Sequence, residues 1–382
     1  MKNVYFDNAA TTRVRDEVIA KMQDALAISY GNPSSTHSFG RTAKSAIESS
    51  RKTIAKYLNA HPSEIIFTSG GTEADNMILR CAVRDLGVKT IITSKIEHHA
   101  VLHTAEELHQ NGQVKLQFVE LDEYGNPVLE HLEKLLLLDD SKKLVSLMHI
   151  NNEIGNKIDI KTIAGLIKKY GALFHSDTVQ SIGHFEWDTQ EIPIDFMAAA
   201  AHKFHGPKGI GFAFIRKNSG LGGFISGGSQ ERGYRAGTES FHNIIGLAEA
   251  FVLAYENLSA ERDTVLGLKK YFIERIQEEI PDVTFNGYSG DLKKSTYTLV
   301  NVCLPVNPQK ALMLLFHLDI KGIACSKGSA CQSGSNVGSH VLSEILSDED
   351  LKKPSLRFSF SKYNTKEEID YTVSVLKEFT QE

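Results

Sequence analysis

Between about residues 60 and 215, short β-branched apolar runs alternate with helical patterns, and this alternation limits the fold more than any other feature. The runs indicate strands at residues 64–68, 90–93, 144–148 and 172–175. Between the last two runs, apolar residues recur with helical spacing at Ile160, Ile163, Ala164 and Ile167. Strands that lack a polar face and are separated by helices are typical of a mainly parallel sheet covered on both faces. The sequence therefore predicts an α/β fold.

The pattern changes after about Tyr255, where a long charged helical segment begins. Beyond it we expect a strand at 297–304, a helix at 308–318, a Gly/Ser-rich loop at 326–339 and an alternating strand at 356–360. The last helix opens with Thr365-x-x-Glu368, a capping-box pattern. We therefore expect a large domain of residues 1–255 and a smaller α+β domain of residues 256–382, with about the first 15 residues packing on the small domain.

Charge and cysteine content exclude several classes of function. The chain has 382 residues and a formal net charge of −5, and its basic residues are scattered, so neither nucleic acid nor a membrane is an expected partner. We find no signal-peptide pattern at the N-terminus and no apolar run long enough to span a bilayer. The cysteines fit neither a disulfide framework nor paired zinc ligands; they are Cys81, Cys303, Cys325 and Cys331. We therefore expect a cytoplasmic protein.

The segment Thr68-Ser69-Gly70-Gly71-Thr72-Glu73-Ala74 falls between a predicted strand and a predicted helix. Such a junction offers free backbone N–H groups and the positive end of a helix, which suits a phosphate group. Gly71 lets the backbone approach closely, and Thr72 adds a hydroxyl. A tight turn without any ligand explains the segment equally well. The chain has neither the G-x-G-x-x-G nor the G-x-x-x-x-G-K-[ST] motif.

Asp177 and Lys203 each follow an apolar run. Asp177 is expected at the carboxyl end of a strand, where ligands gather in open α/β sheets, and it could keep a pyridine nitrogen protonated. It could equally be a helix N-cap. Lys203 lies between Ala198-Ala199-Ala200-Ala201 and a Gly/Pro turn, and burial would favour the neutral amine that forms a Schiff base. Its alternative is a lysine at a strand end whose ammonium reaches solvent.

Two further residues are candidates in the C-terminal part. Cys331 lies among Gly and Ser residues, so we expect it on an exposed, mobile loop, where nearby Lys327 would favour the thiolate; in general such a cysteine is more often inert. Arg357 lies on the alternating strand and points away from Leu356 and Phe358, where it could bind a carboxylate through two parallel hydrogen bonds. Otherwise it is an ordinary exposed arginine.

Taken together, these motifs are identifiable as a pattern that runs nearly from end to end. In order they are Tyr5-Phe6-Asp7-Asn8-Ala9-Ala10-Thr11-Thr12, Gly31-Asn32-Pro33-Ser34-Ser35, Ser-Gly-Gly-Thr-Glu at 69–73, Glu97-His98-His99, Asn151-Asn152-Glu153-Ile154-Gly155, His175-Ser176-Asp177-x-x-Gln180, His202-Lys203, Gly-Ser-Ala-Cys at 328–331 and Leu356-Arg357-Phe358-Ser359. The chain resembles the class V aminotransferase group of fold-type I pyridoxal-phosphate (PLP) enzymes, and within it the NifS/IscS-type cysteine desulfurases.

The resemblance implies a role for each matching position. Lys203 would carry PLP as a Schiff base and, with His98, serve as the acid/base group. The other positions expected to bind the cofactor are Gly71, Thr72, Asn152, Asp177, Gln180 and His202, and Thr238, which would reach the phosphate of a neighbouring subunit in a homodimer. Arg357, assisted by Asn152, would bind the substrate carboxylate, and Cys331 would take the sulfur of L-cysteine as a persulfide, leaving L-alanine. A sulfur acceptor protein, such as an iron–sulfur scaffold or a carrier, is a further implied partner.

One position departs from the family pattern. The family usually has a phosphate-binding serine three residues before the lysine, and here that position is Ala200, which removes one hydrogen bond worth on the order of 1 kcal/mol. The alternatives are a selenocysteine lyase or a class V aminotransferase on the same fold, or a non-catalytic sulfur-relay protein. Cys325 is expected as a core residue at a strand end, or as a thiol that resolves the persulfide. No metal is expected, because adjacent His98 and His99 diverge and no third ligand is evident.

Overall fold

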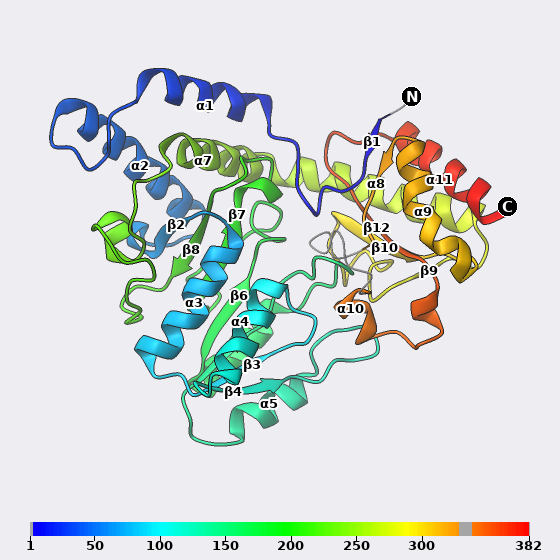
Figure 1. The fold of residues 1–382 in the computed structure, drawn as a ribbon, viewed down its shortest axis with the longest axis horizontal. Helices are drawn as coiled ribbons and strands as arrows, with labels where there is room; N and C mark the ends of the chain where they lie inside the picture. The colour runs from blue at the N-terminus through cyan, green and yellow to red at the C-terminus, as the bar shows by residue number, and fades with distance from the viewer. Residues whose placement is uncertain (1–2, 328–337, 382) are drawn as a thin grey trace.

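A sheet of seven strands forms the centre of the large N-terminal part of the chain (Figure 1). The computed structural model describes residues 3–327 and 338–381. The strands, in spatial order, are β2 (Ile65–Thr68), β8 (Gly211–Ile215), β7 (Phe196–Ala200), β6 (Leu173–Asp177), β5 (Lys143–Ser146), β3 (Thr90–Thr93) and β4 (Lys115–Phe118). Only β8 runs antiparallel to its two neighbours. The predicted mainly parallel sheet is therefore confirmed.

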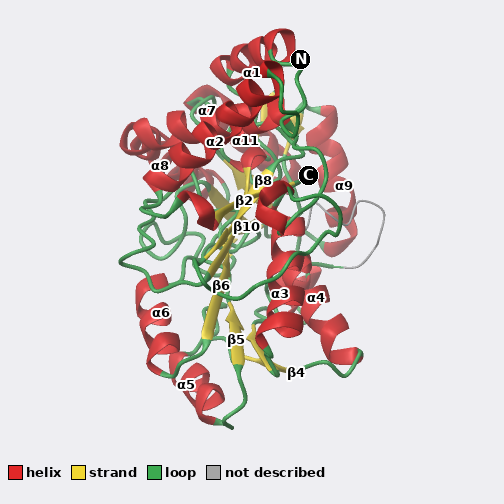
Figure 2. Ribbon diagram, turned by 90° about the vertical axis from the view of Figure 1, so that its left-hand side faces the viewer, coloured by secondary structure: helices red, strands yellow, loops and turns green. Residues whose placement is uncertain are grey.

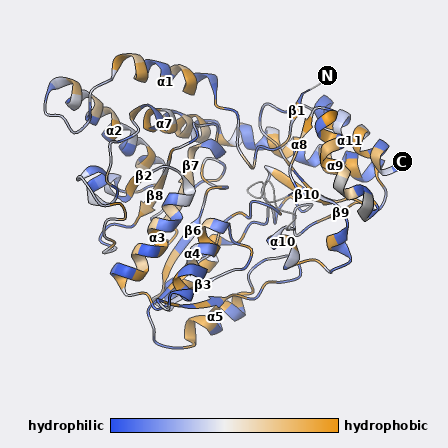
Figure 3. Ribbon diagram, viewed as in Figure 1, coloured by the Kyte–Doolittle hydropathy of each residue, from blue (hydrophilic) through white to orange (hydrophobic). Residues whose placement is uncertain are grey.

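Helices cover both faces of this sheet, as Figure 2 shows for α5 and α6 on one side and α3 and α4 on the other. The first face packs on α1 (Asp16–Ile28), α2 (Ser38–Tyr57), α5 (Leu129–Leu137), α6 (Ile160–Lys169) and α7 (Phe241–Glu256). The second face packs on α3 (Gly71–Leu86) and α4 (His99–Gln110). Neighbouring residues of a strand point to opposite faces of the sheet. Ile65 and Phe67 are buried in the core on the first face, and Ile66 is buried in the core on the second face. The hydropathy colouring in Figure 3 accordingly shows the strands mostly apolar and the helices two-sided.

The rest of the chain forms a smaller α+β unit with its own apolar core. Its antiparallel sheet has the order β12 (Ser355–Ser359), β10 (Leu299–Cys303) and β9 (Thr284–Phe285), and its helices are α8 (Leu258–Glu279), α9 (Pro308–Ile320), α10 (His340–Ser343) and α11 (Lys366–Gln381). At the start of α11, Thr365 and Glu368 exchange the two hydrogen bonds of a capping box, as predicted.

The N-terminus belongs spatially to the small unit. Strand β1 (Val4–Tyr5) pairs in parallel with β11 (Ile323–Ala324), and Val4 and Phe6 are buried in the small core with residues from α8, β12 and α11. Burial of these side chains anchors the start of the chain to the small unit. The strand with which β1 pairs lies more than 250 residues later in the sequence. We propose the two cores as the two domains, divided near residue 255.

Within the described residues, no helix combines the length and apolarity that crossing a membrane requires.

Candidate active site

A cavity of about 370 Å³ lies at the carboxyl edge of the large sheet, where the small domain meets it. The predicted site residues that line it are Gly71, Thr72, His98, Asn152, Asp177, Gln180, His202, Lys203 and Arg357. Thr238 is exposed and does not line the cavity. Cys331 lies outside the residues that the structure describes. The cavity therefore gathers residues from strand ends, a helix start and the small domain, although their roles stay predictions.

One end of the cavity is formed by the start of α3, directly after β2. Among the described residues no side chain caps this helix, so the N–H groups of its first turn and the positive helix end are available to a ligand. Gly71 is required here, because a Cβ on it would lie 2.5 Å from Cγ2 of Val179. The same Cβ would lie 4.0 Å from Cβ of Ala200, so the position at which the family carries serine borders this turn. This end of the cavity suits a phosphate group.

His202 and Lys203 form a short 3₁₀ turn with Ala201 directly after β7. The Lys203 Nζ donates hydrogen bonds to the carbonyl oxygens of Ala9 (2.6 Å) and Ala10 (2.9 Å). The His202 ring Nδ1 lies 3.2 Å from Oγ1 of Thr11, and burial with the nearby Lys203 lowers the pKa of His202 to about 4. The lysine amine thus lies at the cavity, where two backbone carbonyl groups accept hydrogen bonds from it, and the residue is half-buried.

Asp177, the last residue of β6, is a buried carboxyl group at the floor of the cavity. Its Oδ1 accepts a hydrogen bond from the backbone N–H of Val179 (2.9 Å), so it also closes a turn. Burial raises the pKa of Asp177, and the nearby His98 and Lys203 oppose that rise. A buried carboxylate is stable only beside a positive partner, which is what a protonated pyridine nitrogen supplies.

A chain of fully buried polar groups lies behind Asp177, and sequence reasoning missed it. The Ser146 Oγ lies 2.8 Å from Nδ1 of His175, whose Nε2 lies 3.3 Å from Oδ1 of Asp75. Burial, together with the charge of Asp177, raises the pKa of Asp75 well above its usual range, and burial lowers the pKa of His175 to about 3. Asp75 follows Gly71 by four residues on α3, so helical spacing was the available signal for it.

Beside His98 the structure holds further potential metal ligands that were not evident from the sequence. Asp75, His98 and Asp177 each bring a ligand atom to within 4.8 Å of the other two, so a third ligand does exist beside His98. Sequence reasoning missed it because the three residues lie on α3, before α4 and at the end of β6. Two carboxyl groups and an imidazole can bind a divalent metal, and they equally fit a protonated heterocycle between an acid and an aromatic ring.

His98 is the N-cap of α4, where its Nδ1 accepts a hydrogen bond from the backbone N–H of Ala100 (3.1 Å). The proton of the neutral ring is therefore on Nε2. Burial lowers the pKa of His98, which keeps the ring neutral at neutral pH. The neighbouring His99 ring instead stacks between His103 and His340, with centroid distances of 4.4 and 4.3 Å, so the two adjacent side chains have different surroundings.

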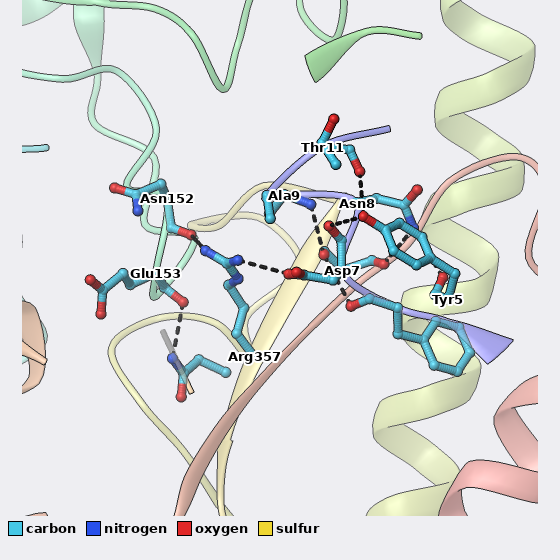
Figure 4. A network of polar contacts seen from close by, with 12 residues as sticks. Tyr5, Asp7, Asn8, Ala9, Thr11, Asn152, Glu153 and Arg357 are labelled. Carbon is cyan, nitrogen blue, oxygen red and sulfur yellow. Dashed lines mark hydrogen bonds and ion pairs between the residues drawn. The ribbon is translucent and has the colours of Figure 1, made fainter. Parts of the chain in front are cut away.

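At the other end of the cavity, Arg357 crosses from the small domain (Figure 4). Its strand neighbours Leu356 and Phe358 are buried in the small core. This confirms the prediction that Arg357 points to the opposite face of the strand. The alternative of an exposed arginine is wrong, because only 1% of the residue is exposed. Its Nη1 donates to the carbonyl oxygen of Asn152 (2.7 Å), and its Nη2 lies 2.9 Å from Oδ1 of Asp7. A guanidinium fixed in this way suits a carboxylate ligand.

Cys325 directly follows β11, at the strand end where a core residue was predicted. It packs against the small apolar core, and burial, with a contribution from Asp7, raises its pKa to about 12. The group is therefore a thiol at neutral pH, which favours packing over attack on a persulfide. Cys81 is buried in the core between the large sheet and α3 and α4, and Cys303 is buried on β10.

The fold and the cavity together define an α/β enzyme class in which a lysine, a buried aspartate and an open helix start converge at a domain junction. The aminotransferase class-V family model matches residues 4–372. The chain therefore belongs to the aminotransferase class-V family.

Relatives and solved structures narrow this assignment. A cysteine desulfurase IscS from Dictyoglomus turgidum is 41% identical over 378 residues, covering 98% of this chain and 94% of the relative. A solved NifS-like protein matches with a TM-score of 0.90 and 35% identity over all of both chains. SspA, solved in complex with cysteine, matches with a TM-score of 0.80 and 30% identity, covering 95% of this chain and 100% of that one.

Proposed function

We propose that this chain is a PLP-dependent cysteine desulfurase, which converts L-cysteine into L-alanine and transfers the sulfur to Cys331 as a persulfide. The observation that carries the proposal is the convergence of Lys203, Asp177, the open start of α3 and Arg357 on one cavity. The similarity to cysteine desulfurases over nearly the whole chain supports the same reaction. No observation favours a selenocysteine lyase, an aminotransferase or a non-catalytic relay protein.

The cavity residues fit the distinct chemical features of PLP. The N–H groups at Gly71 and Thr72 would hold the phosphate with His202, and Asp177 would pair with the protonated pyridine nitrogen. Gln180 would hydrogen-bond the ring oxygen, Asn152 would contribute a further polar contact, and the His98 ring would stack on the cofactor. When bound through Lys203, PLP supplies an electron sink that weakens the bonds around the Cα of an amino acid.

The remaining steps belong to side chains of this protein. The Arg357 guanidinium would bind the α-carboxylate of L-cysteine, with Asn152 assisting, and so orient the substrate. The Lys203 Nζ would take the proton from Cα and return it in the later step, and His98 would serve with it as an acid/base group. The Cys331 thiolate would then attack the substrate sulfur: an S–S bond forms, the Cβ–S bond breaks with its electron pair left on carbon, and protonation of that carbon leads to L-alanine.

The cellular location, the subunit arrangement and the sulfur acceptor are further predictions. We infer that the protein works in the cytoplasm as a homodimer, in which the exposed Thr238 reaches the phosphate of the neighbouring subunit. We also infer that the persulfide passes to an acceptor protein, such as an iron–sulfur scaffold or a carrier.

The test is to incubate the purified protein with L-cysteine and a reducing thiol and to measure alanine and sulfide. We expect equimolar amounts of both from the wild type without any keto-acid acceptor. Cys331→Ser should lose sulfide release by at least about 100-fold, because the attacking nucleophile is gone. Cys325→Ser is the matched control and should retain most of the activity. Undiminished turnover in Cys331→Ser would exclude the proposed role.

A further inference from the structure

Asp7 is the partner of Arg357 at the substrate end of the cavity, although the two residues are 350 positions apart. The Nη2–Oδ1 distance is 2.9 Å, and the exposed fractions of the two side chains are 2% for Arg357 and 20% for Asp7. Within residues 3–327 and 338–381, no other carboxylate lies within ion-pair distance of this guanidinium. A buried guanidinium without an anionic partner is strongly disfavoured, so this contact compensates the buried charge of Arg357 and fixes the position of its guanidinium.

The segment around Asp7 is attached to the strand that carries Arg357. The backbone N–H of Ser359 on β12 donates to the carbonyl oxygen of Phe6 (2.7 Å), and the side chain of Asn8 donates to the carbonyl oxygen of Ser359 (2.8 Å). The Tyr5 hydroxyl donates to the carbonyl oxygen of Thr11 (2.8 Å), as Figure 4 shows. These contacts fix the backbone on both sides of Asp7 independently of Arg357, so the carboxylate projects toward the guanidinium from an anchored segment.

The guanidinium keeps donors for a further ligand. Arginine has five N–H donors, and the contacts to Asp7 and to the Asn152 carbonyl use two of its nitrogens. The Nε of Arg357 is buried and has no hydrogen-bond partner among the described residues. A buried donor without an acceptor costs free energy, and a ligand carboxylate would remove that cost. Asp7 on one side and Asn152 on the other therefore set the plane in which a carboxylate can bind.

The same N-terminal segment also reaches the amine that carries the cofactor in the proposed function. Ala9, two residues after Asp7, offers its carbonyl oxygen to the Lys203 Nζ (2.6 Å) and to the Gln180 side chain (3.0 Å). A displacement of this segment would therefore disturb two ends of the cavity together. A substitution of the Asp7 side chain alone should affect only the carboxylate end, because the contacts of Ala9 are made by its backbone.

We propose that Asp7 is a positioning residue for recognition of the substrate α-carboxylate, acting through Arg357. The inference rests on the proposed function, because it assumes that an amino acid is bound in this cavity. It assigns to Asp7 a role in the affinity for the carboxylate and none in the chemical steps at Lys203 or Cys331.

The test measures equilibrium binding of L-alanine and of ethylamine, which lacks the carboxylate, to the PLP-loaded protein from the change in cofactor absorbance. In Asp7→Ala we expect L-alanine to bind at least about ten-fold more weakly, because one partner of a buried charge pair is removed. The affinity for ethylamine should change less than about two-fold. In Asp7→Asn, which keeps an acceptor oxygen but loses the charge, the loss for L-alanine should be smaller, about three-fold.

Asp16→Ala is the matched control, because Asp16 also pairs with an arginine, Arg13 at 3.0 Å, but on the exposed surface. Asp16→Ala should leave the affinity for both L-alanine and ethylamine unchanged. Equal weakening of both ligands in Asp7→Ala and Asp7→Asn would indicate a merely structural role and overturn the proposal, as would unchanged or tighter binding of L-alanine. Alanine and sulfide production by the wild type tests the proposed function separately from the role of Asp7. If neither product forms, the proposed function is wrong. A loss of affinity that is specific to the carboxylate ligand in the Asp7 variants would still establish the role of Asp7.

Discussion

The two ends of the cavity are built in different ways. At the cofactor end, Asp177, Lys203 and the start of α3 all come from the large domain and lie at the ends of strands of one sheet or shortly after them. At the substrate end, Arg357 comes from β12, its partner Asp7 from the N-terminal segment and its second acceptor from Asn152. The cofactor end is thus set by the geometry of a single sheet, and the substrate end by the packing of three distant segments. Substitutions at the two ends should therefore have separable effects.

The largest expected effect is at the cofactor end. Asp177→Ala removes the buried carboxylate that would pair with the pyridine nitrogen, a loss of roughly 2–5 kcal/mol for a buried charge pair. We therefore expect PLP to bind at least about 30-fold more weakly, as measured by titration of the apoprotein. Asp7→Ala, at the other end, should leave PLP affinity within about two-fold of the wild type. Equal loss in both variants would show that the two ends are not separable.

A smaller effect should come from the buried chain behind Asp177, measured as the pH dependence of stability. The pKa of His175 is lowered to about 3 in the folded protein, so the unfolded chain binds a proton there that the folded chain does not. This contribution to stability is present above the pKa of an unfolded histidine, near 6.5, and is lost as pH falls toward 3.

His175→Asn should therefore flatten the fall in the free energy of unfolding between about pH 6 and pH 4, by about 1.4 kcal/mol per pH unit. Denaturant titrations of the apoprotein at several pH values measure this slope. An unchanged slope would mean that His175 is protonated in the folded state.

The smallest effect is expected at Ala200, where the family usually has a phosphate-binding serine. A serine hydroxyl there would border the turn at Gly71, since the two side-chain positions lie 4.0 Å apart. We expect Ala200→Ser to strengthen PLP binding by about five-fold, which corresponds to one hydrogen bond of about 1 kcal/mol. Unaltered or weaker PLP binding, measured by the same apoprotein titration, would show that this position does not reach the phosphate.

The difference between the two ends also explains what the sequence could predict. Asp177 and Lys203 were identifiable because each ends an apolar run, and an apolar run in an α/β pattern marks the carboxyl edge of a sheet. Asp75 was overlooked because an acid inside a helix is ordinarily solvated, and only the burial of α3 against the sheet makes it part of the site. The partnership of Asp7 with Arg357 could not be predicted, because no local pattern pairs two residues 350 positions apart.

The most direct test of the account is to locate the cofactor on the chain. Reduction of the PLP-loaded protein with borohydride, followed by digestion and mass spectrometry, identifies the lysine to which the cofactor was attached. We expect a pyridoxyl group on the peptide that contains Lys203 and on no other. A modified Lys208 with an unmodified Lys203, or no modified lysine at all, would contradict it.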